Sequence, residues 1–350
     1  MKRTLFAIAL AAFAMTAAAK EKSTDSTSRP IKWYEKIKFS GYGMLQYQYV
    51  NKDENKHNYF NLRLLRLSLD GKISDFDWKV QIQGTSAKGP GEPTVMLVDL
   101  YTEWAKYKEV RIKVGQFKRP FTFENPTHPV TQGWYAYANV INALTGFGDR
   151  TGEKSSSGRD IGIQLQGDVL KNASGRYLLH YQVGVFNGEG INIWDKDQRK
   201  DVIGGMWVNP IEGLRIGAFG WTGSRFDVGR KNRYAFSAEY IKNEYTFRAE
   251  YVHSQGMGSN PALGDKADGW YVFGIVPVIK NKLHAKARYQ TYRDNKDWNR
   301  AKTMYEVGLN YFFHKNIQLN VEYARVNDRT VENPGRHNYN LVDVQLDFRF

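Results

Sequence analysis

The chain has 350 residues, no cysteine and a net charge of +14, from 50 Lys and Arg against 36 Asp and Glu. Without cysteine, disulfide frameworks, thiol catalysis and cysteine-based zinc sites are excluded. The mean hydropathy is −0.58 and the long apolar run of the sequence lies at its extreme N-terminus, which excludes a membrane protein built from several transmembrane helices.

The N-terminus has the pattern of a secretory signal. Lys2 and Arg3 precede an apolar stretch that ends in three alanines at 17–19, which suits an A-x-A cleavage site. The alternative is a buried N-terminal helix. We expect a cleaved signal peptide at 1–19, a flexible periplasmic lead-in at 20–35 and one domain at 36–350. Export without cysteine fits the envelope of a Gram-negative bacterium.

From residue 36 onward, apolar and polar residues alternate in segments of about nine to eleven residues, the length that a tilted transmembrane strand needs. One example is Trp78, Val80 and Ile82, which alternate with Lys79 and Gln81. Strands of soluble sandwiches are shorter, at about five or six residues. Sixteen such segments start near residues 37, 60, 76, 95, 110, 159, 176, 201, 214, 232, 245, 270, 283, 303, 317 and 339.

The connections between these segments alternate between short and long. The short ones fall near 72–75, 106–108, 171–174, 210–212, 243, 281 and 315, and the long ones at 51–58, 86–93, 118–158, 188–200, 223–231, 255–269, 293–302 and 327–336. Short periplasmic turns and long extracellular loops are typical of an outer-membrane barrel. The sequence therefore predicts an all-β fold, a transmembrane antiparallel β-barrel of about 16 strands with both termini on the periplasmic side.

The polar faces of the strands predict a water-filled lumen, because a barrel of this size is too wide for side chains to fill. These faces carry equal numbers of basic and acidic residues, Arg66 and Lys79 among the basic ones, so we expect cross-strand pairing for most of them. The positive excess lies instead in the short turns, at Lys72, Lys106, Lys108, Lys171, Lys242, Lys280, Lys282 and Lys315. These are either solvated turn residues or a basic periplasmic mouth.

The longest connection, 118–158, is rich in aromatic residues and proline, and long loops in compact proteins are usually functional. We expect it to fold into the lumen and to narrow the pore. Basic residues at a constriction favour anions. The candidate residues for anion binding and pore constriction are Arg111, Lys113, Lys118, Arg119, Arg150, Lys154 and Arg159. Glu124, Asp149 and Glu153 in the same loop oppose them, so the expected bias is modest.

Three stretches resemble the phosphate-selective porin O and P family in its Bacteroidetes form. They are Gly-Gln-Phe-Lys-Arg-Pro-Phe at 115–121, Gly-Arg-Asp-Ile-Gly-Ile-Gln-Leu-Gln-Gly at 158–167 and Val-Gly-Val-Phe-Asn-Gly at 183–188. The resemblance runs from about residue 36 to the C-terminus. It implies a sixteen-stranded trimeric porin of the outer membrane whose third loop folds inward, with basic residues that guide anions.

The expected function is a channel for passive diffusion of small solutes that favours anions, phosphate among them. The alternatives are a general diffusion porin without selectivity and, more distantly, a barrel hydrolase. His253 and Ser254 come closest to a hydrolase pair, but adjacent strand residues face opposite ways, so the two are not expected to work together. An adhesive or antigenic role of the long loops is compatible with transport. Expected partners are small anions such as phosphate, outer-membrane lipid and lipopolysaccharide, and further copies of the chain in a homotrimer. No enzymatic activity, cofactor, metal or nucleic-acid partner is expected, although Asp195, Asp197 and Asp201 leave a calcium site open.

Overall fold

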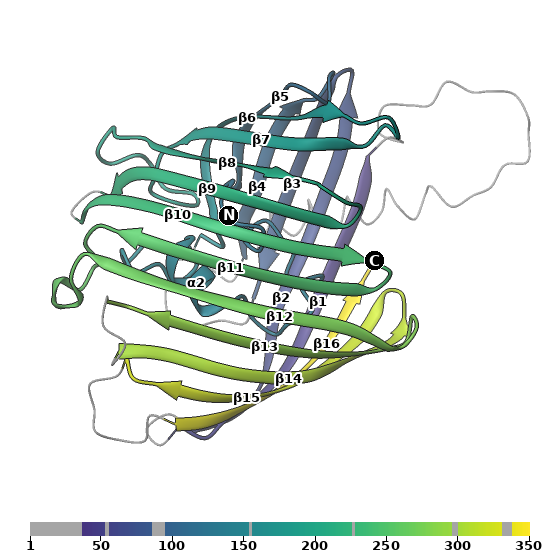
Figure 1. The fold of residues 1–350 in the computed structure, drawn as a ribbon, viewed down its shortest axis with the longest axis vertical. Coiled ribbons are helices and arrows are strands. Elements are labelled where there is room, and N and C mark those ends of the chain that lie inside the picture. Colours follow the sequence, from purple (N-terminus) through teal and green to yellow (C-terminus); the bar gives the residue numbers. More distant parts are fainter. Residues whose placement is uncertain are drawn as a thin grey trace, which may run out of the picture.

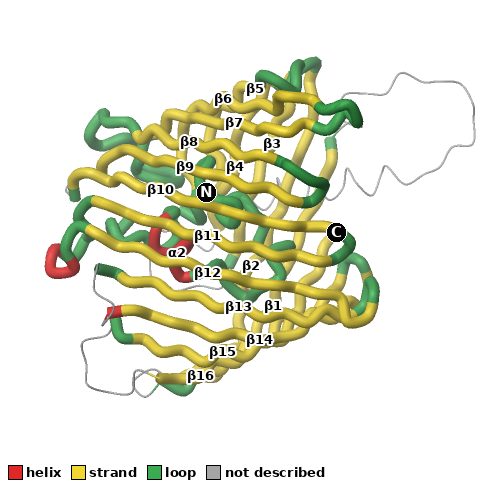
Figure 2. Tube along the Cα trace, in the orientation of Figure 1, coloured by secondary structure: helices red, strands yellow, loops and turns green. Residues whose placement is uncertain are grey.

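The protein is a closed antiparallel barrel in the computed structural model, which describes residues 37–52, 56–85, 95–153, 156–225, 228–295, 300–330 and 338–350. Each strand pairs with its neighbours in the chain, and β1 pairs with β16 to close the ring (Figures 1 and 2). The strands are β1 (Lys38–Val50), β2 (His57–Ile73), β3 (Phe76–Gly84), β4 (Val95–Trp104), β5 (Arg111–Lys118), β6 (Arg159–Lys171), β7 (Tyr177–Phe186), β8 (Asp201–Val208), β9 (Leu214–Arg225), β10 (Gly229–Lys242), β11 (Tyr245–Gln255), β12 (Lys266–Ile279), β13 (Leu283–Arg293), β14 (Ala301–His314), β15 (Ile317–Asp328) and β16 (Asn338–Arg349).

The predicted sixteen-stranded barrel is confirmed, and every strand starts within a few residues of its predicted position. One connection differs. Residues 223–231 were expected to form a long loop, but β9 continues to Arg225 and β10 begins at Gly229, with these two residues paired. The predicted signal peptide and the whole of the predicted lead-in lie outside the described residues.

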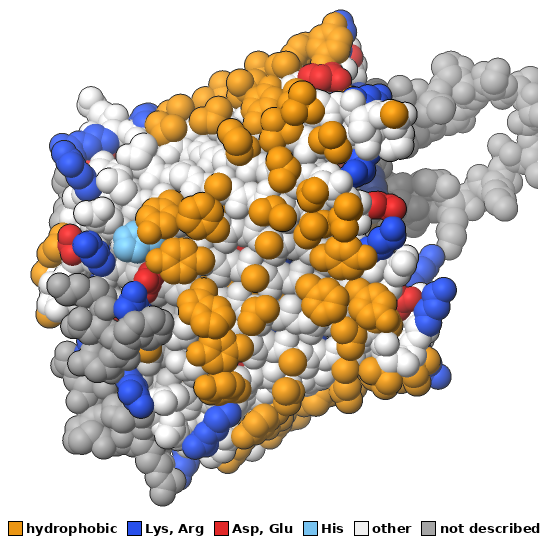
Figure 3. Space-filling model, in the orientation of Figure 1, with side chains coloured by type: hydrophobic (Ala, Val, Ile, Leu, Met, Phe, Trp, Pro, Cys, Tyr) orange, Lys and Arg blue, Asp and Glu red, His pale blue; other side chains and the backbone are white. Residues whose placement is uncertain are grey.

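The two faces of the wall differ as the alternation predicts. Side chains on the outer face, such as Val114, Val185 and Val307, are exposed and apolar, as contact with lipid requires. They form a broad apolar band, with Lys and Arg gathered toward the two rims (Figure 3). None of the helices among the described residues has the length and apolarity needed to cross a membrane.

The inner face carries the expected cross-strand ion pairs. Among them are Lys79–Asp70 at 2.8 Å, Arg215–Glu239 at 2.6 Å, Lys286–Glu322 at 2.5 Å and Arg288–Glu306 at 2.6 Å. Three of these pairs are directly opposite on neighbouring strands, where each stabilises the sheet by up to about 1 kcal/mol, whereas Lys286 reaches Glu322 across Gly308 of β14. Most charged side chains on the inner face are therefore compensated by an oppositely charged neighbour on the wall.

Residues 119–158, here called L3, fold into the barrel and include the short helix α2 (Asn139–Leu144), which lies within the ring of strands in Figure 1. The interior side chains of β10 to β15 hold this loop. Glu250 accepts a hydrogen bond from the Phe123 backbone N–H at 2.5 Å, and Glu322 accepts one from the Tyr135 backbone N–H at 2.7 Å. The predicted inward loop is confirmed. L3 also packs on β8 and β9, where Phe123 meets Trp207 and Phe121 meets Trp221, and cavities remain between L3 and the wall at β1–β9.

Candidate channel constriction

Two cavities lie between L3 and the wall formed by β1 to β9. The inner cavity, of about 400 Å³, reaches Arg111 and Arg215, which stand near the short turns. The outer cavity, of about 650 Å³, reaches Tyr59 and Thr85, which stand near the long loops. Together the two cavities follow the direction that a solute takes from the extracellular to the periplasmic side.

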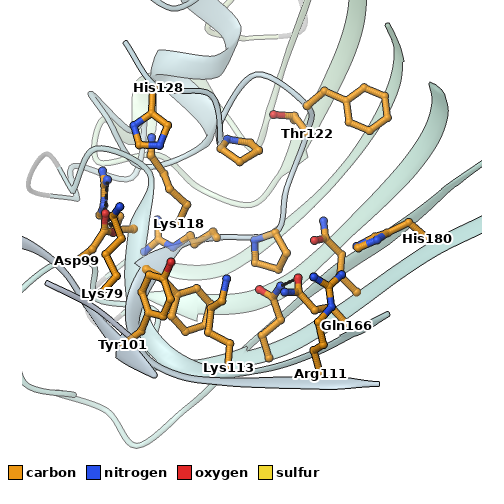
Figure 4. A pocket seen from close by; sticks show the side chains of 18 of the residues that line it. Lys79, Asp99, Tyr101, Arg111, Lys113, Lys118, Thr122, His128, Gln166 and His180 are labelled. Carbon is orange, nitrogen blue, oxygen red and sulfur yellow. Dashed lines mark hydrogen bonds and ion pairs between the residues drawn. The ribbon is translucent and has the colours of Figure 1, made fainter. Parts of the chain in front are cut away.

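The inner cavity is strongly basic. Lys79, Arg111, Lys113 and Lys118 point toward it from the strands, and Asp99 is the one carboxylate among its described lining residues (Figure 4). Most of these cations have a partner. Arg111 lies 2.8 Å from Asp168, and Lys113 lies 3.4 Å from Glu103. Their charges are therefore partly compensated at the wall.

Lys118 differs from these paired cations. Its Nζ atom is buried and has neither a hydrogen-bond partner nor an ion pair among the described residues. The amine lies 5.2 Å from the centroid of the Tyr137 ring and 4.7 Å from that of Phe147, so aromatic faces are its direct contacts, and Asp99 and Glu124 act on it only at longer range. Lys118 lines the inner cavity while Tyr137 and Phe147 line the outer cavity, which puts the amine at their junction.

Arg66 also lacks a carboxylate partner within the part of the chain that the structure describes, as does Arg63, and both line the outer cavity. Its Nε and Nη2 atoms donate to the amide oxygen of Gln83, at 3.0 and 2.7 Å, and its guanidinium lies 5.9 Å from the Tyr42 ring. The remaining Nη1 atom is buried without a hydrogen-bond partner. Arg66 lines the outer cavity, and the set of candidate residues drawn from the sequence did not include it.

The structure brings part of the predicted set together. Arg111, Lys113, Lys118, Arg119 and Arg159 all border the inner cavity. Arg119, however, is fully buried between Glu153 and Asp160, at 3.0 and 2.8 Å. Both carboxylates compensate its charge, and the two ion pairs hold the base of L3 closed.

Arg159 is also buried, where it holds Asp99 at 2.6 Å. Arg150 lies away from both cavities and donates to the carbonyl oxygens of Gly256 and Gly264, at 2.5 and 3.2 Å. It therefore ties L3 to another loop instead of facing the pore. Lys154 lies outside the described residues.

The structure agrees with the expectation that His253 and Ser254 do not form a catalytic pair. His253 stacks on Tyr234, whereas Ser254 is buried and hydrogen bonds to Arg233, so the two side chains point to opposite faces of β11. Asp201 is buried against Lys231, at 2.8 Å. Within the described ranges no cluster of acidic or histidine side chains is able to hold a metal ion.

A closed sixteen-stranded barrel with an inward loop that narrows its lumen defines an outer-membrane porin. Residues 134–330 match the Gram-negative porin family, and residues 39–184 match the phosphate-selective porin O and P family. The chain belongs to the Gram-negative porins, and its predicted resemblance to porin O and P is confirmed. It is a channel of the outer membrane for passive diffusion.

Solved porin structures share the fold at low sequence identity. The anion-selective porin from Comamonas acidovorans has a TM-score of 0.67 and 12% identity, over 90% of this chain and 99% of that one. OmpF of Salmonella typhi, in complex with daunomycin, has a TM-score of 0.66 and 13% identity, over 90% and 97%. The trimer form of OmpT from Vibrio cholerae has a TM-score of 0.58 and 13% identity, over 90% and 99%. No curated protein matches the chain.

Proposed function

We propose that this porin favours small anions and that Arg66 and Lys118 form its selective step. The observation that carries the proposal is that Arg66 borders the outer cavity and Lys118 the inner cavity, each without a carboxylate partner within the described residues. Charges beyond about 8 Å are screened at physiological ionic strength. A permeating ion therefore responds chiefly to unpaired charges that it passes closely.

The other predicted residues enter this proposal in lesser roles. Arg111 and Lys113 remain cavity-lining cations whose charge is partly cancelled by Asp168 and Glu103. Arg119 and Arg159 support the wall through buried ion pairs. We assign Arg150 to loop packing, and Lys154 stays a prediction.

The proposal is tested by the zero-current potential across a planar bilayer under a KCl gradient. The double variant R66Q/K118Q is expected to move this potential toward cation preference relative to the wild type. The conservative variant K118R, which keeps the charge, is expected to retain anion preference. A matched control, K108Q/K280Q/K282Q/K315Q, removes four lysines of the periplasmic turns and is expected to leave the potential unchanged.

Two outcomes would contradict this assignment. A shift in the turn variant but not in R66Q/K118Q would move selectivity to the periplasmic mouth. A wild-type potential near zero would show a general diffusion porin, the alternative that the balanced charge of the wall supports.

We propose phosphate as one of the solutes, supported by the match to the porin O and P family over residues 39–184. Added phosphate is expected to reduce the chloride current of the wild type more strongly than that of R66Q/K118Q. Equal reduction in both would argue against a phosphate site at these residues.

We also propose that the porin acts as a homotrimer without enzymatic activity. The likeness in fold to the trimer form of OmpT from Vibrio cholerae supports the assembly, and the apolar outer band supports contact with outer-membrane lipid and lipopolysaccharide. Native mass measurement in detergent is expected to give three copies. A population of monomers alone would contradict the trimer.

A further inference from the structure

Three exposed lysines stand close together at two neighbouring periplasmic turns. Lys280 and Lys282 lie in the turn between β12 and β13, and Lys315 lies in the turn between β14 and β15. Because β13 pairs with β14, the two turns are adjacent, and the Phe312 backbone N–H donates to the Lys282 carbonyl oxygen at 2.9 Å. We call these three lysines the lysine corner.

The lysine corner has no ion pair among the residues that the structure describes. The acid on the adjoining turn, Glu244, is already engaged, since it accepts a hydrogen bond from the Asn281 backbone N–H at 2.7 Å and lies 2.8 Å from Nε2 of His284. Glu244 therefore acts on Lys280 only at longer range, and no carboxylate pairs directly with any of the three amines among the described residues.

Other lysines of the same rim are compensated. Lys72 lies 3.4 Å from Asp77, and Lys242 lies 2.9 Å from Glu212. Lys106 lies 4.0 Å from an oxygen of the Asp75 carboxylate. The rim thus offers a matched set of paired lysines for comparison with the lysine corner.

Apolar side chains border the lysine corner on the outer face of the barrel. Val278 is 59% exposed, Ile279 51% and Phe313 63%, at the periplasmic ends of β12 and β14. As exposed apolar side chains near the membrane boundary, they are suited to contact with lipid. Lys282 extends alongside Tyr311, with its amine 5.9 Å from the ring centroid. Lysines at such a border keep their stems in the apolar layer and their amines at the depth of the lipid headgroups.

We propose that the lysine corner binds the phosphate of an anionic phospholipid in the periplasmic leaflet of the outer membrane. A phospholipid is able to contact both the apolar side chains and the lysines. Its acyl chains would cover Val278, Ile279 and Phe313, and its headgroup phosphate would meet the amines. A soluble anionic polymer would satisfy the amines alone. This binding site is separate from the selective step of the channel and does not depend on it.

The test compares how the solubilised full-length porin retains phosphatidylglycerol and phosphatidylcholine with the same acyl chains, by native mass spectrometry. Each lysine near an anionic lipid surface contributes roughly fivefold in affinity. The variant K280Q/K282Q/K315Q is therefore expected to lose about tenfold or more of its phosphatidylglycerol affinity. The control K72Q/K106Q/K242Q, which removes paired lysines, is expected to keep it.

A second measurement needs no variant. Retention of phosphatidylglycerol by the wild type should fall as NaCl rises, whereas retention of phosphatidylcholine should not. The proposal is overturned if the wild type holds both lipids equally, or if both triple variants lose phosphatidylglycerol to the same extent. Displacement of the lipid by soluble peptidoglycan fragments at equal concentration would also overturn it, because the surface would then serve the cell-wall polymer.

Discussion

Glu103 accepts a hydrogen bond from Gln166 at 2.5 Å and lies 3.4 Å from the Lys113 amine in the inner cavity. The same amine lies 4.7 Å from the centroid of the Tyr101 ring. The Lys113 amine is therefore held by both the ring and the carboxylate, and the carboxylate partly masks its charge. A permeating ion therefore experiences less positive potential from such a paired lysine than it would from the same lysine without its carboxylate.

Replacement of Glu103 by glutamine is expected to raise the anion-to-cation permeability ratio about two- to fivefold. Two unit charges about 4 Å apart interact by ~1 kcal/mol in water, so freeing the Lys113 amine exposes a charge effect of that order. The zero-current potential under a KCl gradient measures the change. The control is D77N, which frees Lys72 at the rim and is expected to have little effect. A shift toward cations in E103Q would refute the masking argument.

Burial in the lumen changes the pKa of the L3 residue His128 and therefore its charge at a given pH. Burial within the barrel, followed by the positive charges of Arg66 and Lys79, lowers the pKa of this L3 histidine to about 4. The imidazole is therefore neutral above that pH and gains its charge only below it. At pH 7.5 and at pH 5.5 it adds nothing to the lumen charge.

The variant H128N is expected to have the same zero-current potential as the wild type at both pH 7.5 and pH 5.5. The comparison with the wild type at each pH cancels the titration of other groups. Stronger anion preference of the wild type at pH 5.5 alone would mean that His128 is protonated there and that its surroundings are less positive than described.

Among the elements, L3 depends on a tight closure at its base. Gly158 has a φ of +71°, and its carbonyl oxygen accepts from the Arg119 backbone N–H at 2.9 Å. A Cβ atom on Gly158 would stand 1.8 Å from Oδ1 of Asn125, whose amide is itself bonded to the Arg119 carbonyl oxygen. The backbone conformation and the close contact both require glycine here.

The substitution G158A is expected to destabilise the folded barrel by about 2 kcal/mol or more, because a left-handed conformation costs an L residue about 1–2 kcal/mol before the clash is counted. Gly148 is a matched control in the same loop, since a Cβ there meets nothing within 4 Å. G148A should therefore unfold like the wild type. Heat-induced loss of the folded band on a gel compares the three proteins, and equal midpoints for G158A and G148A would contradict the closure argument.

Over the whole molecule, the barrel was predictable because its wall separates lipid from water. That separation imposes the two-residue alternation seen at Trp78, Val80 and Ile82, and it sorts short turns from long loops. The loop at 223–231 was misjudged because its polar residues read as loop, while pairing of Arg225 with Gly229 extends the hairpin. Where a strand extends beyond the membrane, both of its faces meet water, so its sequence lacks the apolar and polar alternation from which a strand is predicted.

The constriction was less predictable, because its contacts join segments that are distant in the sequence. Lys118 and Arg119 are neighbours in the chain, yet one meets the rings of Tyr137 and Phe147 while the other is buried between carboxylates. Arg66 was read as lumen-facing from the register of its strand. Its lack of a carboxylate partner among the described residues depends on how L3 and the wall meet, which no local pattern records.

The most direct test of the central claim is the zero-current potential of the wild-type porin in a planar bilayer under a tenfold KCl gradient. The unpaired charges of Arg66 and Lys118 predict a potential of the sign set by chloride, with anions more permeant than cations. A potential near zero, or one of the sign set by potassium, would contradict the claim that these two cations govern passage through the channel.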